Sequence, residues 1–206
     1  MKTHKTNEIR NIGMFSHGGT GKTSLAEAML FTSGAINRLG QVEEGTTVAD
    51  YEPEETKRHI SIQLALVPLE WKGAKLNIID SPGYADFMGE VRQAMRVVDG
   101  ALILIDASSG VEVGTDLVWR YADEYSLPRA IFMNRIDREN ADFLRTLEQL
   151  RESFGNGVVP IQAPIGAQDN FRGLVDLVSD KALLFGSGGG QATEVPADMR
   201  GQVDSW

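Results

Sequence analysis

A glycine-rich run near the start of the chain constrains its fold more than any other feature. The run Ser16-His17-Gly18-Gly19-Thr20-Gly21-Lys22-Thr23 follows an apolar segment, residues 9–15, which is predicted to be a strand. Residues 22–32 are predicted to form a helix that ends at Gly34 as its C-cap. The apolar side chains of that helix share one face: Leu25, Ala26, Met29 and Leu30. A strand, a tight turn and a helix are therefore expected in this order.

The residue types in the run suit a phosphate group. The run matches the last three positions of G-x-x-x-x-G-K-[ST], and Ser16 stands at the position of the first glycine. Glycines let several backbone N–H groups face one anion, and the helix N-terminus adds its positive dipole end. Lys22 can reach outer phosphates, and the Thr23 hydroxyl suits Mg²⁺. The alternative is a glycine-rich turn beside a surface lysine.

Short apolar runs alternate with helix-like segments further along the chain. This pattern predicts an α/β fold of the P-loop type, with a mostly parallel sheet and helices on both faces. Strands are expected at residues 61–71, where Ile62, Leu64 and Leu66 alternate, and at 76–79, 101–105 and 130–133. Helices are expected from three apolar sets: Phe87, Val91, Ala94, Met95 and Val98; Val113, Leu117, Tyr121 and Ala122; Ala141, Leu144, Leu147, Leu150 and Phe154. Residues 35–59 are expected to form a long, mobile loop.

The pattern changes towards the C-terminus. Residues 1–157 are interpreted as the nucleotide-binding core and 158–206 as the truncated beginning of an inserted α+β subdomain. This second part contains an expected strand at 158–165, short apolar runs at 173–184 and a flexible glycine-rich loop at 186–190. The apolar residues Met199, Val203 and Trp206 follow a helical spacing up to the last position.

Composition narrows the possible partners and compartments. The net charge of −9, from 29 acidic and 20 basic residues, argues against a broad surface that grips a nucleic-acid backbone. The sequence contains no cysteine, so disulfides, thiolate zinc sites and cysteine nucleophiles are excluded. No apolar run is long enough for a membrane span, and no apolar core follows the charged N-terminus as in a secretory signal. A cytoplasmic location without membrane contact is expected.

Three further polar sites follow predicted strands or the long loop. Asp80-Ser81-Pro82-Gly83 could hold a Mg²⁺-bound water through its aspartate and offer the Gly83 N–H to a γ-phosphate, although it is also a good turn sequence. Asn134-Arg135-Ile136-Asp137 could read guanine, whose ring N–H and exocyclic amine suit the Asp137 carboxylate, or Asp137 could cap a helix. Ser61 could be a second hydroxyl ligand of Mg²⁺ or an ordinary serine at the start of a strand.

Taken together, these motifs resemble elongation factor G, a translational GTPase. The similarity covers nearly the whole chain and includes the glycine-rich run and six further segments: Arg10-Asn11-Ile12-Gly13, Val42-Glu43-Glu44-Gly45, Asn77-Ile78-Ile79-Asp80-Ser81-Pro82-Gly83, Met95-Arg96-Val97-Val98-Asp99-Gly100-Ala101, Gly110-Val111-Glu112 and Pro164-Ile165-Gly166. The resemblance implies a sheet around the phosphate loop, two nucleotide-sensing switches, hydrolysis triggered by the ribosome, and further domains after residue 206.

The resemblance also implies a set of site residues. The residues expected to bind GTP or GDP are His17, Gly18, Gly19, Thr20, Gly21, Lys22, Thr23, Ser24, Asp80, Gly83, Asn134, Arg135 and Asp137. Thr23, Ser61 and Asp80 are expected to serve Mg²⁺, and Lys22, Gly83 and Tyr84 are expected to act in catalysis. A final base-contacting loop of Ser-Ala type has no counterpart before Trp206.

Several positions depart from the family pattern. Tyr84 stands where the family usually has a histidine that positions the attacking water, and a phenol is bulkier and a weaker base than an imidazole. Gly19 replaces an aspartate, while Ser61 and Arg135 replace threonine and lysine with similar chemistry. The pattern resembles divergent elongation-factor-G-like paralogues. The expected activity is GTP hydrolysis; a nucleotide-dependent ribosome-binding module with little hydrolysis is the alternative, and an ATPase is disfavoured by Asn134 and Asp137.

Overall fold

The computed structural model describes residues 3–186 and 189–206. The chain divides into two compact units, one comprising residues 1–105 with 112–132 and the other residues 106–111 with 133–206. These units differ from the two domains expected from the sequence, which divide at residue 157. That division concerns the nucleotide-binding core and the inserted subdomain, and it stays a prediction. Each unit is described by itself below.

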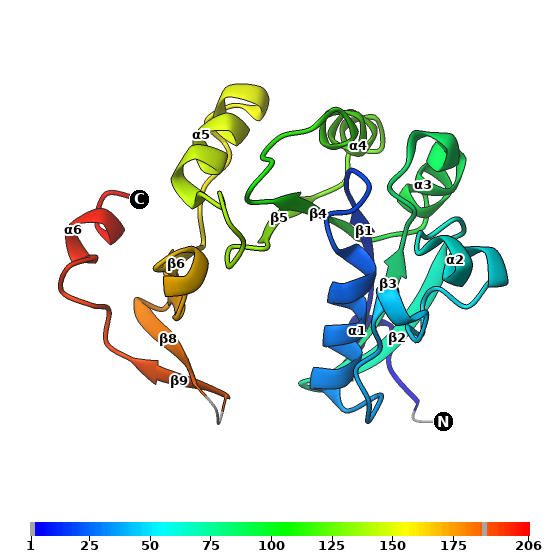
Figure 1. Cartoon of the computed structure of the whole chain (residues 1–206), viewed down its shortest axis with the longest axis horizontal. Coiled ribbons are helices and arrows are strands. Elements are labelled where there is room, and N and C mark those ends of the chain that lie inside the picture. Colours follow the sequence, from blue (N-terminus) through cyan, green and yellow to red (C-terminus); the bar gives the residue numbers. More distant parts are fainter. Residues whose placement is uncertain (1–2, 187–188) are drawn as a thin grey trace. The chain divides into compact units, whose positions relative to one another are not determined.

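A five-stranded sheet forms the framework of the first unit, in the order β2-β3-β1-β4-β5 (Figure 1). Its strands are β1 (Ile9–Phe15), β2 (Ala65–Trp71), β3 (Ala74–Asp80), β4 (Gly100–Asp106) and β5 (Arg129–Asn134). The last residue of β4 and the last two residues of β5 are counted with the second unit. The central strand β1 pairs in parallel with β3 and with β4, whereas β2 pairs antiparallel with β3. The expected mostly parallel sheet is confirmed.

Four helices and three short 3₁₀ turns accompany this sheet. The helices are α1 (Lys22–Ser33), α2 (Pro53–Arg58), α3 (Met88–Met95) and α4 (Val113–Glu124), and the turns are η1 (Thr6–Glu8), η2 (Val42–Glu44) and η3 (Ala85–Phe87). α1 begins directly after the glycine-rich run and ends at Gly34, whose φ of 76° and backbone N–H bonds to Leu30 and Phe31 cap it as expected.

Neighbouring residues of β1 show that the two faces of the sheet are covered differently. The Met14 side chain belongs to a buried cluster with Ala26 and Leu30 of α1. A side chain at the preceding residue, Gly13, would instead meet Val98, which follows α3. Because successive strand residues point to opposite faces, α1 and the segment directly after α3 lie on opposite faces of the sheet. The expected arrangement of helices on both faces is confirmed.

The strand predicted over residues 61–71 is shorter and its alternation has the other phase. β2 begins at Ala65, and its buried residues are Ala65, Val67 and Leu69. Leu66, which was expected to face the core, is 64% exposed. The reason lies in the pairing with β3, since the antiparallel register places Val67 opposite the buried Ile78.

The segment expected to be a loop without regular structure, residues 35–59, contains α2. This short helix has Pro53 at its first position, and the Glu52 and Glu55 side chains form a capping box. Acidic residues in the first turn and Lys57 and Arg58 in the last turn complement the helix dipole. These local signals outweigh the lack of an apolar period in a helix of only six residues.

The predicted apolar face of α4 is only partly correct. Val113, at the first position of the helix, is 83% exposed. The buried positions of α4 are Gly114, Thr115, Val118 and Ala122. The buried face therefore begins with two small residues rather than with valine.

The second unit contains the antiparallel sheet β6-β7-β8-β9. Its elements are α5 (Phe143–Phe154), β6 (Gln162–Ile165), η4 (Gln168–Asn170), β7 (Gly173–Asp176), β8 (Lys181–Gly186), β9 (Gly189–Thr193) and α6 (Arg200–Val203) (Figure 1). Ile165, Val175, Ala182 and Val195 form its buried centre, and Met199 and Val203 pack against them. The glycine-rich loop predicted at 186–190 lies partly outside the described residues. None of the described helices is long and apolar enough to span a membrane.

Candidate functional site

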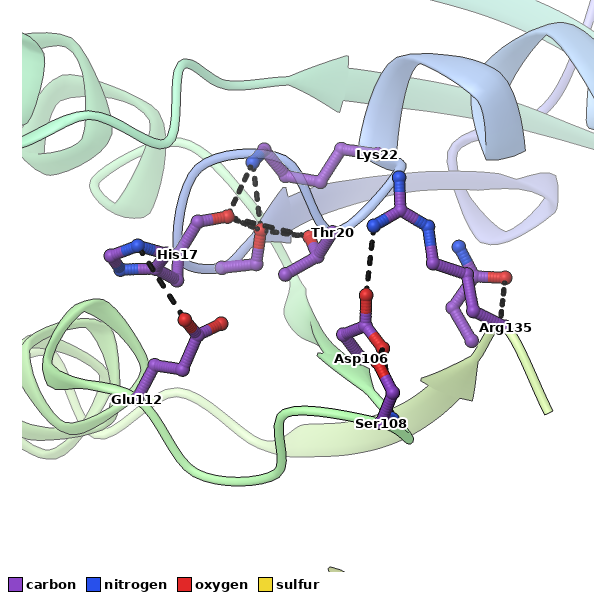
Figure 2. A network of polar contacts seen from close by, with 9 residues as sticks. His17, Thr20, Lys22, Asp106, Ser108, Glu112 and Arg135 are labelled. Atoms are coloured by element: carbon purple, nitrogen blue, oxygen red, sulfur yellow. Dashed lines mark hydrogen bonds and ion pairs between the residues drawn. The ribbon is translucent and has the colours of Figure 1, made fainter. Parts of the chain in front are cut away.

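The glycine-rich run forms a compact loop between β1 and α1. Gly19 and Gly21 have φ values of 81° and 92°, a left-handed conformation that disfavours side chains. The buried hydroxyls of Ser16 and Thr20 are hydrogen-bonded to each other at 2.6 Å, and the Ser16 hydroxyl also donates to the His17 carbonyl at 2.7 Å (Figure 2). Ser16 therefore closes the loop through its hydrogen bond with Thr20. It stands at the position of the motif's first glycine, and the sequence did not reveal this role.

Lys22 turns its ammonium group back onto this loop. Its Nζ donates to the Ser16 hydroxyl at 2.7 Å and to the His17 carbonyl at 3.5 Å (Figure 2). Burial lowers the pKa of Lys22 to about 8, although the carboxylates of Asp80 and Asp50 act in the opposite direction. Below this pH the buried Lys22 carries its positive charge at the start of α1, where it can receive an anion.

Asp80, at the end of β3, is fully buried near the same loop. Neither of its carboxylate oxygens has a hydrogen-bond partner among the described residues. Burial raises the pKa of Asp80 to about 6, and the Lys22 charge and the nearby Thr23 hydroxyl only partly offset this effect. Buried polar atoms are nearly always satisfied, so this carboxylate points to a cation or an ordered water as its partner.

Two hydroxyls complete a set of oxygen donors for such a cation. Thr23 Oγ1 and Ser61 Oγ are hydrogen-bonded at 3.0 Å, and Ser61 donates to Asp50 Oδ1 at 2.7 Å. Carboxylate and hydroxyl oxygens are the ligands that Mg²⁺ prefers. The residues expected to serve the metal, Thr23, Ser61 and Asp80, therefore have the chemistry that Mg²⁺ requires. Asp50 joins this group and was not predicted.

Buried glutamates hold the long segment that leads to Ser61. Glu55 of α2 accepts hydrogen bonds from the backbone N–H groups of Ile62 and Gln63 at 2.8 and 3.0 Å. Glu27 of α1 accepts from the N–H groups of Gly40 and Val48. Sequence reasoning missed both roles because a glutamate on a helix is ordinarily solvated. The segment is held in place by charge-assisted hydrogen bonds on both sides.

Gly83 and Tyr84 follow Asp80 and lie against the glycine-rich loop. A Cβ atom at Gly83 would stand 2.6 Å from Lys22 Nζ and 2.8 Å from Gly18 Cα, so no side chain fits there. The Tyr84 ring contacts Gly18 and is 42% exposed. The three residues expected to act in catalysis, Lys22, Gly83 and Tyr84, are thus gathered at one place in the first unit.

The loop also contacts the start of α4, through His17. His17 Nε2 lies 3.7 Å from Glu112 Oε1 (Figure 2). A Cβ atom at Gly114 would stand 2.8 Å from both the Cα and Nδ1 of His17. The exposed Ser24 lies in the first turn of α1. The residues expected to bind nucleotide from His17 to Ser24 therefore form one continuous segment, the glycine-rich loop and the first turn of α1, in which Thr20, Lys22 and Thr23 are buried.

The expected base-recognition residues belong to the second unit. Arg135 adopts a φ of 61°, its backbone N–H donates to Asn134 Oδ1 at 2.9 Å, and its Nη1 donates to Asp106 Oδ2 at 2.8 Å (Figure 2). Burial opposes ionisation of Asp106, but hydrogen bonds from Ser108 and Arg135 prevail and lower its pKa. Asp106 fixes the arginine side chain, and no sequence motif pointed to it.

Asp137 lies beyond this network. Its side chain is exposed, and it makes no hydrogen bond to another residue in the described part of the chain. The backbone between Asn134 and Asp137 is held because the Ala107 N–H donates to the Asn134 carbonyl at 3.0 Å and Ile136 packs with Ala107 and Ala141. The carboxylate is therefore presented on an ordered turn and is available to a ligand.

Comparison with known proteins agrees with this geometry. Residues 7–196 match the family described as the elongation factor Tu GTP-binding domain. A crystal structure of a protein from Thermus thermophilus matches 96% of this chain with a TM-score of 0.91 and 37% sequence identity. This chain covers 30% of the length of that protein. The expected resemblance to the GTP-binding domain of translational GTPases is confirmed. The chain belongs to the elongation factor Tu GTP-binding domain family.

Proposed function

We propose that this chain is the GTP-binding domain of an elongation-factor-G-like GTPase that hydrolyses GTP to GDP and phosphate. The observation that carries the proposal is the buried Asp80 carboxylate without a protein partner, in a unit where Lys22 and the Thr23 and Ser61 hydroxyls also converge. In the reaction, the oxygen of a water molecule bonds to the γ-phosphorus, and the bond between this phosphorus and the β–γ bridging oxygen breaks.

The residues of the first unit receive the triphosphate in this proposal. The backbone N–H groups from Gly18 to Thr23 surround the phosphates, and the Lys22 ammonium balances their charge. Thr23, Ser61 and Asp80 would hold Mg²⁺, which neutralises charge on the phosphate oxygens when bound. Gly83 offers its N–H to the γ-phosphate, and its close contact with Lys22 supports this role. Tyr84 lies beside it and presents a hydroxyl.

The residues of the second unit read the base. The Asp137 carboxylate accepts hydrogen bonds from the ring N–H and the exocyclic amine of guanine, which adenine cannot supply together. Arg135, held by Asp106, offers the apolar part of its side chain to the ring, and Asn134 supports the turn. The exposed, unpartnered state of Asp137 and the ordered turn that bears it support this assignment.

Competition binding tests the guanine preference. A fluorescent GDP analogue bound to the protein should be displaced by GDP at a concentration at least about 100-fold lower than by ADP, because adenine leaves the Asp137 carboxylate unpaired. Asp137→Asn should weaken GDP binding and improve binding of xanthosine diphosphate, whose second carbonyl suits an amide donor. Equal affinity for GDP and ADP would count against a guanine site. The exposed Asp169→Asn serves as the matched control.

We further propose that intrinsic turnover is slow and that the ribosome accelerates it in the intact cytoplasmic protein. The support is family resemblance together with Tyr84, which replaces a histidine that usually positions water. Tyr84→Phe removes only the hydroxyl, so ribosome-stimulated turnover of the intact variant measures what that hydroxyl contributes. An unchanged rate removes the hydroxyl from the mechanism.

Tyr84 also favours the second candidate function, a nucleotide-dependent ribosome-binding module with little hydrolysis. Single-turnover hydrolysis of radiolabelled GTP by the intact protein, with and without ribosomes, separates the two functions. Release of phosphate within the time of ribosome binding supports the enzyme. Retention of intact GTP on the ribosome-bound protein supports the binding module.

A further inference from the structure

The three glycines of the phosphate loop have different reasons to be glycine. Gly19 and Gly21 have positive φ values of 81° and 92°, which side chains rarely adopt. A side chain at Gly19 would meet nothing within 4 Å, so its constraint is purely conformational. Gly18 is not among the residues with positive φ. Its backbone conformation would therefore accept alanine.

A side chain at Gly18 would be crowded by the ring of Tyr84. A Cβ atom at Gly18 would stand 3.0 Å from both Cε1 and Cζ of Tyr84 and 3.2 Å from Cδ1. Such distances are shorter than an ordinary carbon–carbon contact of about 3.5–4.0 Å. The edge of the ring nearest to the hydroxyl thus rests on the bare backbone of the phosphate loop.

Gly83 directly precedes Tyr84, and its close contact with Gly18 places Tyr84 against the phosphate loop. A Cβ atom at Gly83 would stand 2.8 Å from Gly18 Cα and 2.9 Å from Gly18 N, so the two backbones are in direct contact. Tyr84 is 42% exposed, and no other residue in the described part of the chain hydrogen-bonds to its hydroxyl. Without the contact at Gly18, the ring of such an exposed side chain would be free to change rotamer.

We propose that Gly18 is a positioning residue for Tyr84. Its contact with the ring fixes the phenol against the phosphate loop, and this determines where the hydroxyl lies beside a bound nucleoside triphosphate. The inference rests on the proposed hydrolytic function. The bulkier tyrosine is accommodated because the loop residue beneath it has no side chain. Gly18 and Tyr84 act as one steric unit, so their effects on hydrolysis are coupled.

A double-mutant cycle in the intact protein tests this coupling. Gly18→Ala should lower single-turnover GTP hydrolysis about tenfold when Tyr84 is present, because the methyl group displaces the ring. In the Tyr84→Ala background the same substitution should lower the rate by a distinctly smaller factor, because any effect on nucleotide binding remains but there is no ring to displace. Gly19→Ala is the matched control, because its backbone strain is independent of Tyr84 and its effect should be equal in both backgrounds.

A second measurement reports the contact without any nucleotide. In the NMR spectrum of the 206-residue chain, the ring current of Tyr84 should shift an α-proton of Gly18, and Tyr84→Ala should abolish this shift while leaving the Gly19 α-protons much less affected. An unchanged Gly18 signal overturns the inference whatever the enzyme activity. Equal penalties for Gly18→Ala in both backgrounds, in a protein that hydrolyses GTP, overturn the coupling alone. A wild-type protein that retains the contact but never hydrolyses GTP overturns the proposed function and the positioning role with it.

Discussion

At the scale of single residues, the Asp80 carboxylate is buried without a hydrogen-bond partner among the described residues, and its ionisation is costly. Its pKa in the folded chain, about 6, lies above its ordinary value of 3.8, so folding favours the protonated form. The ionised form therefore destabilises the fold, and this cost develops as the pH rises from about 4 to about 6. A cation bound at Asp80 would remove the cost.

This cost predicts the behaviour of Asp80→Asn. In metal-free buffer the free energy of unfolding of the wild type should fall relative to that of the variant by up to about 3 kcal/mol between pH 4 and pH 6. Urea unfolding at several pH values measures the difference. The exposed Asp116→Asn on α4 is the control, and its profile should follow the wild type. Parallel profiles for wild type and Asp80→Asn would show that the carboxylate is not buried as an unpaired charge.

Lys22 predicts a second pH dependence, this time in ligand binding. Its pKa in the free protein is lowered to about 8, so the ammonium is increasingly neutralised above this pH. A bound triphosphate favours the charged form, so binding takes up a proton and the affinity should fall as the pH rises above 8, by at most about tenfold per pH unit.

Calorimetry in buffers with different ionisation enthalpies measures the proton uptake by Lys22. Lys22→Arg keeps the charge at all these pH values, and any remaining binding by this variant should lose the proton uptake. A wild-type affinity that is constant between pH 7 and pH 10 would contradict the neutralisation of Lys22.

Some residues of the candidate site could be predicted from the sequence and others could not. Lys22, Thr23 and Asp80 were predicted because each occupies a fixed position in a motif whose chemistry needs that residue type. The hydroxyl pair of Ser16 and Thr20 and the Asp106 carboxylate under Arg135 were not predicted, because these roles depend on which distant groups meet in space. Pair contacts of this kind have no local sequence signature.

At the scale of elements, α2 holds the segment before β2 in place through its buried glutamate, Glu55. Glu55 is buried and satisfies the N–H groups of Ile62 and Gln63 directly after Ser61. Glu55→Ala should leave these donors without a partner, destabilise the protein by about 2 kcal/mol and accelerate hydrogen exchange at both amides. Hydrogen-exchange mass spectrometry of the peptide that contains residues 60–64 measures the change.

Glu54→Ala provides the matched control for this prediction. Glu54 precedes Glu55 in the same helix, but it is exposed and pairs only with Arg58, at 3.1 Å. Exposed pairs contribute little, so exchange at residues 60–64 should remain as in the wild type. Equal acceleration in the two variants would mean that α2 acts through its helicity alone and that the Glu55 carboxylate does not anchor the segment.

Elements with strong local signals were predicted well. The bounds of β1 coincide with the predicted strand, and α1 extends only one residue beyond the predicted helix, because the glycine-rich turn and Gly34 mark its ends. α2 was missed because it has no apolar face to bury and is specified by its caps. The phase of β2 was wrong because alternating apolar residues occupy both of its faces, so only the pairing with β3 decides which face is buried.

At the scale of the whole molecule, the charge sets the character of any contact with RNA. The chain carries a net charge of −9, and several of its arginines form ion pairs with carboxylates, as in Arg92 with Glu124 and Arg129 with Asp123. Non-specific binding to nucleic acids depends on neutralising backbone phosphates with unpaired cations. A long-range attraction to RNA is therefore not expected for this chain.

The corresponding prediction concerns a labelled RNA hairpin without ribosomal sequence. Fluorescence anisotropy at about 150 mM salt should give a dissociation constant weaker than about 10⁻⁴ M, which is the weak end of the non-specific range for nucleic-acid-binding proteins, and little dependence on salt. A variant that replaces exposed α5 glutamates with lysine, Glu148→Lys with Glu152→Lys, should bind more tightly and lose that affinity as salt is added. If the wild type instead bound the RNA at micromolar concentration with a steep salt dependence, its basic residues would have to form a local positively charged patch despite the negative net charge. Weak binding would mean that any ribosome contact by this domain depends on specific complementary groups, because general electrostatic attraction could not hold it there.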